Sequence, residues 1–217
     1  MGYIDVHTHL LPFIDDGVSS KEQCVEVLQA YQKAGFDRII ATPHLYNPYV
    51  TTRTANIRAM YQWASQEASQ LGIKLYLGSE VYIGSGNATN VLPFMERFVL
   101  VEVDYYSEPL FLLNQVYTLL KRGLHVVLAH VERYRWFSTT SPTACKLREL
   151  GVHFQCNVDG VENHSAAKWL SAGWIDVIAS DNHGDSQLPP RLAALLQRYQ
   201  DVANRMNNLF ISYDTIQ

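Results

Sequence analysis

The stretch IDVHTHLLPFIDDG, residues 4–17, determines how the rest of the chain is interpreted. It begins as a short apolar run, and His7 and His9 stand two residues apart where that run ends. Alternate residues of a strand point to the same side, so the two imidazoles can face a common partner. Asp15 and Asp16 follow in a loop that is close enough in sequence to fold back over the strand end. The stretch therefore predicts a first strand that carries part of a binding site.

A short pattern recurs after this stretch: a segment with helical spacing, then a glycine, then an apolar run. The glycines of the pattern are Gly35, Gly72, Gly123, Gly151 and Gly173. A helix often ends at such a residue, because glycine tolerates the left-handed conformation. Ser19 with Glu22 predicts a capping box for the first helix, and Pro142 is expected to be a first helical residue.

The apolar runs, such as HVVLAH and FVLVEV, are nearly continuous, which is typical of strands buried on both faces. Strands that alternate with helices predict parallel βαβ units and an α/β fold. The chain contains about seven such runs, enough to close a (β/α) barrel; an open doubly wound sheet is the alternative. No linker or change of composition divides the chain, so we expect residues 1–217 to form a single domain.

Ionisable side chains stand at the C-terminal ends of most of these runs. They are His7 and His9, His44, Glu80, Glu102, His130, and Asp181 with His183, and the loop residue Asp16 joins them. In a parallel barrel these ends share one face, which is where active sites are built. One histidine at a strand end is usually a solvated surface residue, but nine such residues at six strand ends and one loop predict a common site.

The chemistry of these nine residues predicts bound metal ions. Imidazole and carboxylate ligands without thiolate suit divalent ions such as manganese, iron or zinc. Nine ligands exceed one tetrahedral or octahedral site, so we expect two or three ions, most simply Mn²⁺, with Fe, Mg or Zn as alternatives. Glu80 is a carboxylate that could bridge neighbouring ions.

The remaining polar residues near these runs are expected to have other roles. His125 and His153 stand early in their strands and should lie at the opposite end of the fold, and His164 is expected to open a helix. Asp15 is expected to cap or orient its loop. Asn157 is assigned a packing or hydrogen-bonding role, with substrate contact as the alternative.

Composition excludes several classes of protein. The 217 residues are 47% hydrophobic and 18% charged, which is typical of a globular chain rather than a disordered one. The formal net charge is −4, and no block of basic residues predicts a nucleic-acid or membrane surface. We see no secretory signal and no membrane span, and Cys24, Cys145 and Cys156 are interpreted as reduced thiols. A cytoplasmic location is expected.

The chain resembles the PHP (polymerase and histidinol phosphatase) superfamily, and within it the bacterial PHP-type tyrosine-protein phosphatases of capsule and exopolysaccharide operons. The motifs that carry the resemblance span nearly the whole chain and are DVHTHLLPFIDDG, ATPH, GSEV, AHVERY and SDNH. HTH alone is shared with many amidohydrolases, but the set with DDG and HVERY is specific. The resemblance implies a distorted (β/α)7 TIM-like barrel.

The resemblance also implies roles for individual residues. The nine residues named above would hold a trinuclear cluster, and Arg133 would bind a substrate phosphate; a surface ion pair is the alternative for Arg133. A second arginine of the family maps only loosely onto Arg191, and VEVDYYS lacks the Phe-Pro that often follows the acid matched by Glu102. The implied reaction is hydrolysis of phosphotyrosine, and the implied partner is the tyrosine-rich tail of a bacterial tyrosine kinase.

Two other functions remain open from the sequence. The same cluster could serve a histidinol-phosphate-type phosphatase or a phosphodiesterase, and a non-catalytic phosphoprotein-binding regulator could retain a relict site. No cysteine is followed six residues later by arginine, so a thiolate-based tyrosine phosphatase is excluded. Tyr46 and Tyr49 are expected either to flank an aromatic substrate or to be exposed without a role.

Overall fold

The strands of the protein form two parallel sheets. The structure is a computed structural model, and it describes residues 2–84 and 90–210. One sheet has the order β1-β2-β4, with β1 at Tyr3–Thr8, β2 at Phe36–Ala41 and β4 at Lys74–Leu77. The other has the order β3-β5-β6-β7-β8-β9, formed by His44–Leu45, Glu80–Tyr82, Phe98–Glu102, His125–Leu128, His153–Asn157 and Val177–Ala179.

All seven predicted runs contain strands, but two of the runs are divided. The second run gives β2 and β3, which are separated by Thr42 and Pro43, and the third gives β4 and β5, separated by Gly78 and Ser79. The break lets β2 pair with β1 on one side and with β4 on the other, while β3 and β5 continue into the second sheet. Strand splitting of this kind distorts the barrel without changing the chain order.

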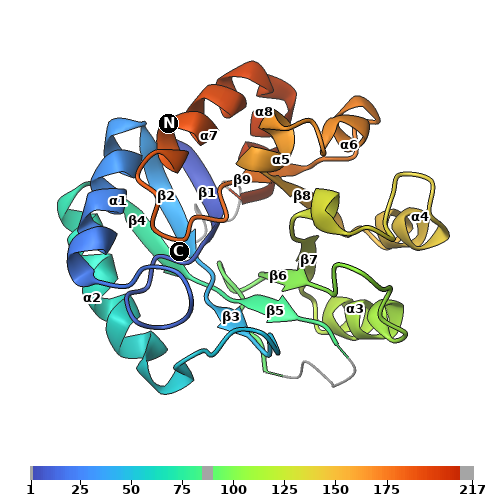
Figure 1. Ribbon diagram of the computed structural model, residues 1–217, viewed down its shortest axis with the longest axis horizontal. Coiled ribbons are helices and arrows are strands. Elements are labelled where there is room, and N and C mark those ends of the chain that lie inside the picture. Colours follow the sequence, from blue (N-terminus) through green and yellow to red (C-terminus); the bar gives the residue numbers. More distant parts are fainter. Residues whose placement is uncertain (1, 85–89, 211–217) are drawn as a thin grey trace.

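Hydrogen bonds connect the last strand to the first. The Asp181 backbone N–H donates to the His7 carbonyl at 2.9 Å, and the His9 N–H donates to the Asn182 carbonyl at 2.8 Å. Figure 1 shows the strands around the centre of the molecule with helices outside them. The strands thus follow one another around a distorted barrel. This arrangement favours the predicted (β/α) barrel over the alternative of an open sheet.

The helices surround the strands and lie where the glycine pattern predicts. They are α1 (Lys21–Lys33), α2 (Ile57–Gln70), α3 (Leu112–Lys121), α4 (Pro142–Glu149), α5 (Val158–Glu162), α6 (Ala167–Ser171), α7 (Leu188–Arg198) and α8 (Gln200–Phe210), with 3₁₀ turns η1 (Thr54–Asn56) and η2 (Val131–Arg133). The five glycines of the pattern have φ between 71° and 88°, so the prediction of left-handed helix ends is confirmed. None of the helices in residues 2–84 and 90–210 is long and apolar enough to cross a membrane.

Two predictions about helix starts are wrong and one is confirmed. Ser20, not Ser19, caps α1, and its hydroxyl accepts from the Gln23 N–H at 3.1 Å. His164 does not open a helix; it stands exposed in the turn between α5 and α6 with φ of 66°. Pro142 is the first residue of α4, as expected. Both errors are of one to three residues, at places where hydrophobic spacing gives no guidance.

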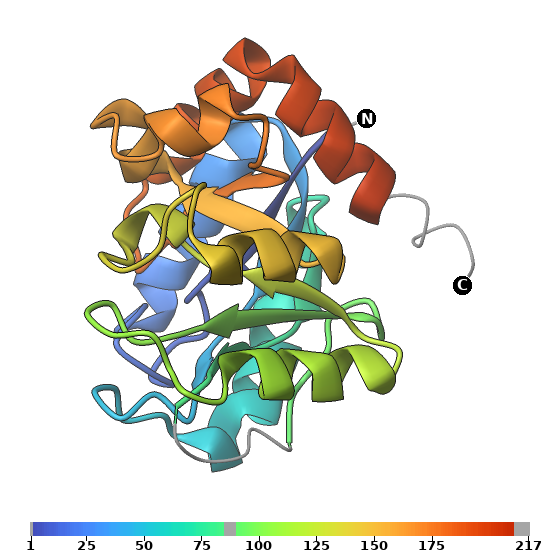
Figure 2. The same ribbon diagram turned by 90° about the vertical axis from the view of Figure 1, so that its right-hand side faces the viewer.

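The core is built from strand residues and the inner faces of the helices. Val6, Ile39, Leu100 and Val127 are fully buried inside the strands. His125 and His153 begin β7 and β8, so they lie at the end of the barrel where strands start, as predicted. Figure 2 shows the loops after β1 and β6 projecting together from the opposite end. That end carries the ionisable residues.

Candidate metal centre

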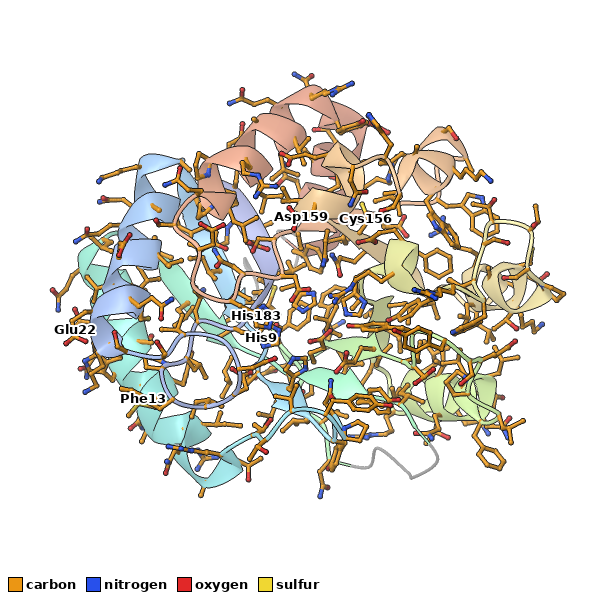
Figure 3. The ribbon with its side chains drawn as sticks, viewed as in Figure 1. His9, Phe13, Glu22, Cys156, Asp159 and His183 are labelled. Carbon is orange, nitrogen blue, oxygen red and sulfur yellow. The ribbon has the colours of Figure 1, made fainter. Side chains whose placement is uncertain are left out.

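The nine predicted residues converge at the C-terminal end of the barrel. β1 carries His7, with His9 directly after it; β3 and β5 begin with His44 and Glu80; β6 ends with Glu102. His130 precedes η2, Asp181 and His183 follow β9, and Asp16 lies in the loop after β1. Figure 3 shows His9 and His183 side by side near the centre of the barrel. Their imidazole rings stack with centroids 4.2 Å apart.

Glu80 lies at the centre of the cluster. Its Oε2 is 3.2 Å from His7 Nε2, 3.3 Å from His9 Nε2 and 3.1 Å from His44 Nδ1. The carboxylate is fully buried, yet Oε2 has no hydrogen-bond partner in the described part of the chain. A buried carboxylate oxygen that faces three imidazole nitrogens suits a ligand shared between cations.

The side chains form three groups that could each hold one ion. The groups are His9, Asp16, His44 and His183; His7, His9 and Asp181; and His44, Glu80 and Glu102. Within each group the candidate ligand atoms lie within 4.8 Å of one another, and His9 and His44 each belong to two groups. This donor chemistry fits divalent ions of the manganese, iron or zinc type.

His130 joins the cluster from a strained backbone position. Its Nε2 is 2.9 Å from Glu80 Oε1, whereas its buried Nδ1 has no partner among the described residues. The residue has φ of 30° and ψ of 53°, and Asp181 also has a positive φ of 54°. Left-handed conformations are uncommon in residues other than glycine, and they concentrate at functional sites. The two turns direct the side chains of His130 and Asp181 into the cluster of candidate ligands.

Asp15 orients the loop, as predicted, and it also orients one imidazole. Its Oδ2 is 2.9 Å from His9 Nδ1 and accepts from the His44 N–H at 3.1 Å, while Oδ1 accepts from the Gly17 N–H at 3.1 Å. The Asp15 side chain is buried, but that of Asp16 is 52% exposed and faces the cluster. A carboxylate behind an imidazole fixes the ring and leaves its other nitrogen for a ligand.

The cluster has strongly perturbed acidities. Burial alone would lower the pKa of His7, but the carboxylates of Glu80 and Asp181 outweigh it and raise the pKa to about 9. Burial would raise the pKa of Glu80 and of Asp181, yet the imidazoles hold both well below their usual range. The site therefore balances its carboxylates with positive charge, which protonated imidazoles supply when no cation is bound.

Arg133 borders this cluster on the solvent side. Its Nη1 donates to Asp181 Oδ2 at 3.0 Å, and its guanidinium lies 4.7 Å from the centre of the Tyr105 ring. The side chain is 43% exposed, so part of the guanidinium is available to a ligand. The predicted second arginine is placed differently, because Arg191 forms ion pairs with Asp159 and Glu162 at the start and end of α5.

A cleft of about 370 Å³ lies over the cluster and has aromatic walls. Its polar floor includes most of the candidate ligands and Arg133, and its walls include Tyr49, Tyr82, Tyr105 and Tyr106. Tyr49 is 79% exposed at the rim, whereas Tyr46 turns away and donates from its hydroxyl to the Asn90 carbonyl at 3.0 Å.

Sequence reasoning missed Tyr82, Tyr105 and Tyr106 as part of this cleft. All three stand at or just beyond the ends of β5 and β6, so the strand-end rule that found Glu102 could have found them. As tyrosines, they fall outside the His, Asp and Glu pattern that predicts the metal site.

Comparisons with known proteins find bacterial tyrosine-protein phosphatases. The chain is 26% identical to the tyrosine-protein phosphatase YwqE of Bacillus subtilis over 196 residues, covering 83% of this chain and 77% of that one. It is 22% identical to the tyrosine-protein phosphatase CpsB of Streptococcus pneumoniae, covering 93% and 90%. A crystal structure from work on these two metal-dependent tyrosine phosphatases superposes with a TM-score of 0.79 at 22% identity, over 93% of this chain and 90% of that one.

The family profile described as "Capsular polysaccharide synthesis, CpsB/CapC" matches residues 3–213, which is nearly the whole chain. On that match, the chain belongs to the CpsB/CapC family of capsular polysaccharide synthesis proteins.

Proposed function

We propose that this protein is a metal-dependent protein-tyrosine phosphatase that acts in capsule or exopolysaccharide synthesis. The observation that carries the proposal is the set of three donor groups beneath a cleft that Arg133 and four tyrosines border. The family assignment and the phosphatase relatives support the same reaction. His7, His9, Asp16, His44, Glu80, Glu102, His130, Asp181 and His183 would hold two or three ions, with Mn²⁺ as the first candidate.

The reaction is hydrolysis of a phosphate monoester. Divalent ions held by these residues would supply an acidified water and positive charge for the phosphoryl oxygens. Arg133 can add a guanidinium fork, a geometry that suits phosphate oxygens. The tyrosinate leaving group has a pKa of about 10, so it needs less protonation on departure than an alkoxide does.

The walls of the cleft favour an aromatic ester over a small polar one. Tyr49, Tyr82 and Tyr106 offer ring surface beside the polar floor. Offset or edge-on ring contacts contribute about 0.5–1.5 kcal/mol beyond area burial. We propose that the substrate is the tyrosine-rich tail of a bacterial tyrosine kinase, and that the enzyme acts in the cytoplasm as a single domain.

Metal removal and thiol blocking test the reaction class together. The protein should lose p-nitrophenyl phosphate hydrolysis after chelation and regain it with Mn²⁺. Iodoacetamide should leave it active. Cys24 and Cys156 are buried, and burial raises the pKa of the Cys24 thiol to about 12, while the exposed Cys145 is not among the residues that line the cleft. Full activity in the metal-stripped protein would contradict the proposal.

A substrate comparison separates the remaining candidates. kcat/KM should be higher for a phosphotyrosine peptide than for histidinol phosphate or bis(p-nitrophenyl) phosphate. A preference for histidinol phosphate or for the diester would replace the proposed substrate. Binding of the phosphopeptide by the Mn²⁺-loaded protein without turnover would identify a regulator.

A further inference from the structure

β8 carries no candidate ligand, but two of its polar side chains form hydrogen bonds with residues of the candidate metal centre. Gln155 and Asn157 stand two apart on β8, so they share one face of the strand. Gln155 is fully buried and Asn157 is 8% exposed. Buried amides of this kind require hydrogen-bond partners, and here the partners come from three other segments of the barrel.

The partners of Gln155 fix the orientation of its amide. Gln155 Oε1 lies 2.9 Å from the His130 backbone nitrogen and 3.2 Å from His7 Nδ1. A backbone N–H can only donate, so the atom that faces it must be the oxygen. An amide oxygen can only accept, and His7 Nδ1 must therefore carry a proton. The Nε2 atom of His7 is then the nitrogen that faces Glu80 and Asp181, each at 3.2 Å.

The same direction of donation continues through Asn157. Gln155 Nε2 donates to Asn157 Oδ1 at 2.7 Å, and Asn157 Nδ2 donates to Asp181 Oδ2 at 2.8 Å. Arg133 donates to that same Asp181 oxygen, which leaves Oδ1 facing His7 Nε2. This series of hydrogen bonds thus leaves His7 Nε2 and Asp181 Oδ1 as the atoms that can bind a metal ion.

The same hydrogen bonds also hold both left-handed turns of the site in place. His130 and Asp181 have positive φ, and each is held by a bond from β8: one to the His130 N–H and one to the Asp181 carboxylate. A left-handed residue without such support would relax toward the ordinary conformations and move its side chain out of the cluster of candidate ligands.

We propose that Gln155, acting with Asn157, is a positioning residue that sets the protonated nitrogen of His7 and holds His130 and Asp181 in the geometry that binds metal. This inference rests on the metal site of the proposed function. It does not place either amide on a metal or on the substrate, and it concerns binding affinity before it concerns turnover.

Two substitutions of Gln155 separate positioning from packing. Gln155→Met keeps the length of the side chain and removes both acceptor bonds, whereas Gln155→Glu keeps an acceptor for His130 and His7. The Met variant should bind Mn²⁺ about 10–100-fold more weakly, the usual effect of removing a partner behind a ligand. The Glu variant should bind much more tightly than the Met variant. The control is Gln115→Met, a buried glutamine of α3 that donates to the Gly84 carbonyl and should leave the affinity unchanged.

Nitrogen NMR gives a readout that loss of packing would not produce. Long-range ¹H–¹⁵N spectra of histidine-labelled protein loaded with diamagnetic Zn²⁺, with the His7 signals identified from a His7→Gln spectrum, should show His7 protonated at Nδ1 in wild type and in Gln155→Glu. In metal-loaded Gln155→Met that preference should be lost. The shorter Gln155→Asn, which cannot reach both donors, serves the same purpose if the Met variant does not fold.

The possible outcomes are distinct. Wild-type Mn²⁺ affinity in Gln155→Met or Gln155→Asn would overturn the positioning role while leaving the proposed function intact. A His7 ring protonated at Nε2 with Nδ1 bound to metal would also overturn it. Absence of Mn²⁺ binding by the wild-type chain would reject the proposed function, and this inference would fall with it.

Discussion

Arg133 combines two contacts with an exposed guanidinium, which makes it the first single residue to change. It pairs with Asp181, stacks on Tyr105 and keeps 43% of its side chain exposed toward the cleft. Arg133→Ala should lower kcat/KM for a phosphotyrosine peptide about 10–100-fold, because charge-assisted hydrogen bonds contribute roughly 1.5–3 kcal/mol. The melting temperature should change little, since exposed ion pairs contribute about 0–1 kcal/mol. Steady-state kinetics and thermal melting measure the two effects.

The neighbouring Arg135 provides a matched control for this substitution. Its guanidinium lies over the Tyr106 ring at 4.9 Å, and it is not among the residues that line the cleft. Arg135→Ala should therefore leave kcat/KM within about twofold of wild type. An equal loss of kcat/KM in the Arg133→Ala and Arg135→Ala variants would show that Arg133 has no particular role in binding the substrate.

Single residues also show where sequence reasoning stops. The ligand candidates were predictable because ionisable side chains at strand ends are visible as a pattern along the chain. Gln155 was not predictable, because its partners are His7 and His130, which are 148 and 25 positions away in the sequence. A buried amide has no signature in composition or periodicity, and its role appears only when the barrel brings β1, β7 and β8 together.

At the scale of elements, the loop after β1 depends on close approach at Gly17. A Cβ at position 17 would lie 2.2 Å from the His9 carbonyl oxygen and 2.5 Å from the His9 Cβ. Gly17→Ala must therefore displace the loop that carries Asp15 and Asp16, at a cost of about 1–3 kcal/mol. We expect a lower melting temperature together with weaker Mn²⁺ binding, measured by titration calorimetry.

Gly72→Ala is the control for this loop substitution. Gly72 has φ of 72° with open space around it, so alanine there should cost about 1–2 kcal/mol of backbone strain without touching the site. Its melting temperature should fall while Mn²⁺ affinity stays unchanged. If the two glycine variants bind Mn²⁺ equally well, the loop after β1 does not shape the metal centre.

The opposite end of the barrel depends on Asp176, which precedes β9. Its carboxylate accepts from the Phe154 N–H at 3.0 Å and pairs with Arg148. Burial would raise the pKa of Asp176, but His153, the Phe154 N–H and Arg148 together lower it. Asp176→Asn should therefore destabilise the fold at pH 7, by about 1.5–3 kcal/mol for hydrogen bonds to a charged group.

The pH dependence of this effect has a definite sign. A carboxylate whose pKa is lower in the folded than in the unfolded state stabilises the fold above the unfolded value of about 3.9. That stabilisation disappears as pH falls through the folded pKa. Melting of wild type and Asp176→Asn should differ clearly at pH 6–7 and converge toward pH 3. A constant difference across this range would show that the charge of Asp176 contributes nothing.

The elements themselves were largely predictable, for identifiable reasons. The left-handed glycines and the apolar runs are local signals, so the strands and the helix ends followed from them. The division of two runs into β2 with β3 and β4 with β5 depends on pairing between sheets, which no local pattern reports. The cap of α1 differs by one residue because Ser19 and Ser20 are adjacent candidates of the same type.

At the scale of the whole molecule, the metal centre ties the barrel together. Its candidate ligands come from β1, β3, β5 and β6, from the turns after β7 and β9 and from the loop after β1, so bound ions would connect both sheets. A ligand at about 100 times its dissociation constant that binds only the folded state adds about 2.7 kcal/mol. For a chain of this length that corresponds to a rise in melting temperature of roughly 5–10 °C with Mn²⁺.

His183→Ala is a suitable control for metal stabilisation. The His183 side chain is 36% exposed, so its removal should disturb packing little while it depletes the group formed with His9, Asp16 and His44. The rise in melting temperature with Mn²⁺ should shrink in this variant. Identical melting curves for wild type with and without Mn²⁺, with occupancy verified by elemental analysis, would contradict a metal centre that braces the fold.

The stabilisation by Mn²⁺ should also increase with pH. In the metal-free protein the pKa of His7 is raised to about 9, above the value of about 6.5 in the unfolded chain. Protonated His7 therefore stabilises the metal-free fold below pH 6.5, and this contribution is lost as pH rises through 9. Bound metal replaces that proton as the positive charge beside Glu80 and Asp181. The difference in melting temperature with and without Mn²⁺ should therefore be larger at pH 9 than at pH 6.5, and a difference that is constant or falls would show that protons and metal do not compete for His7.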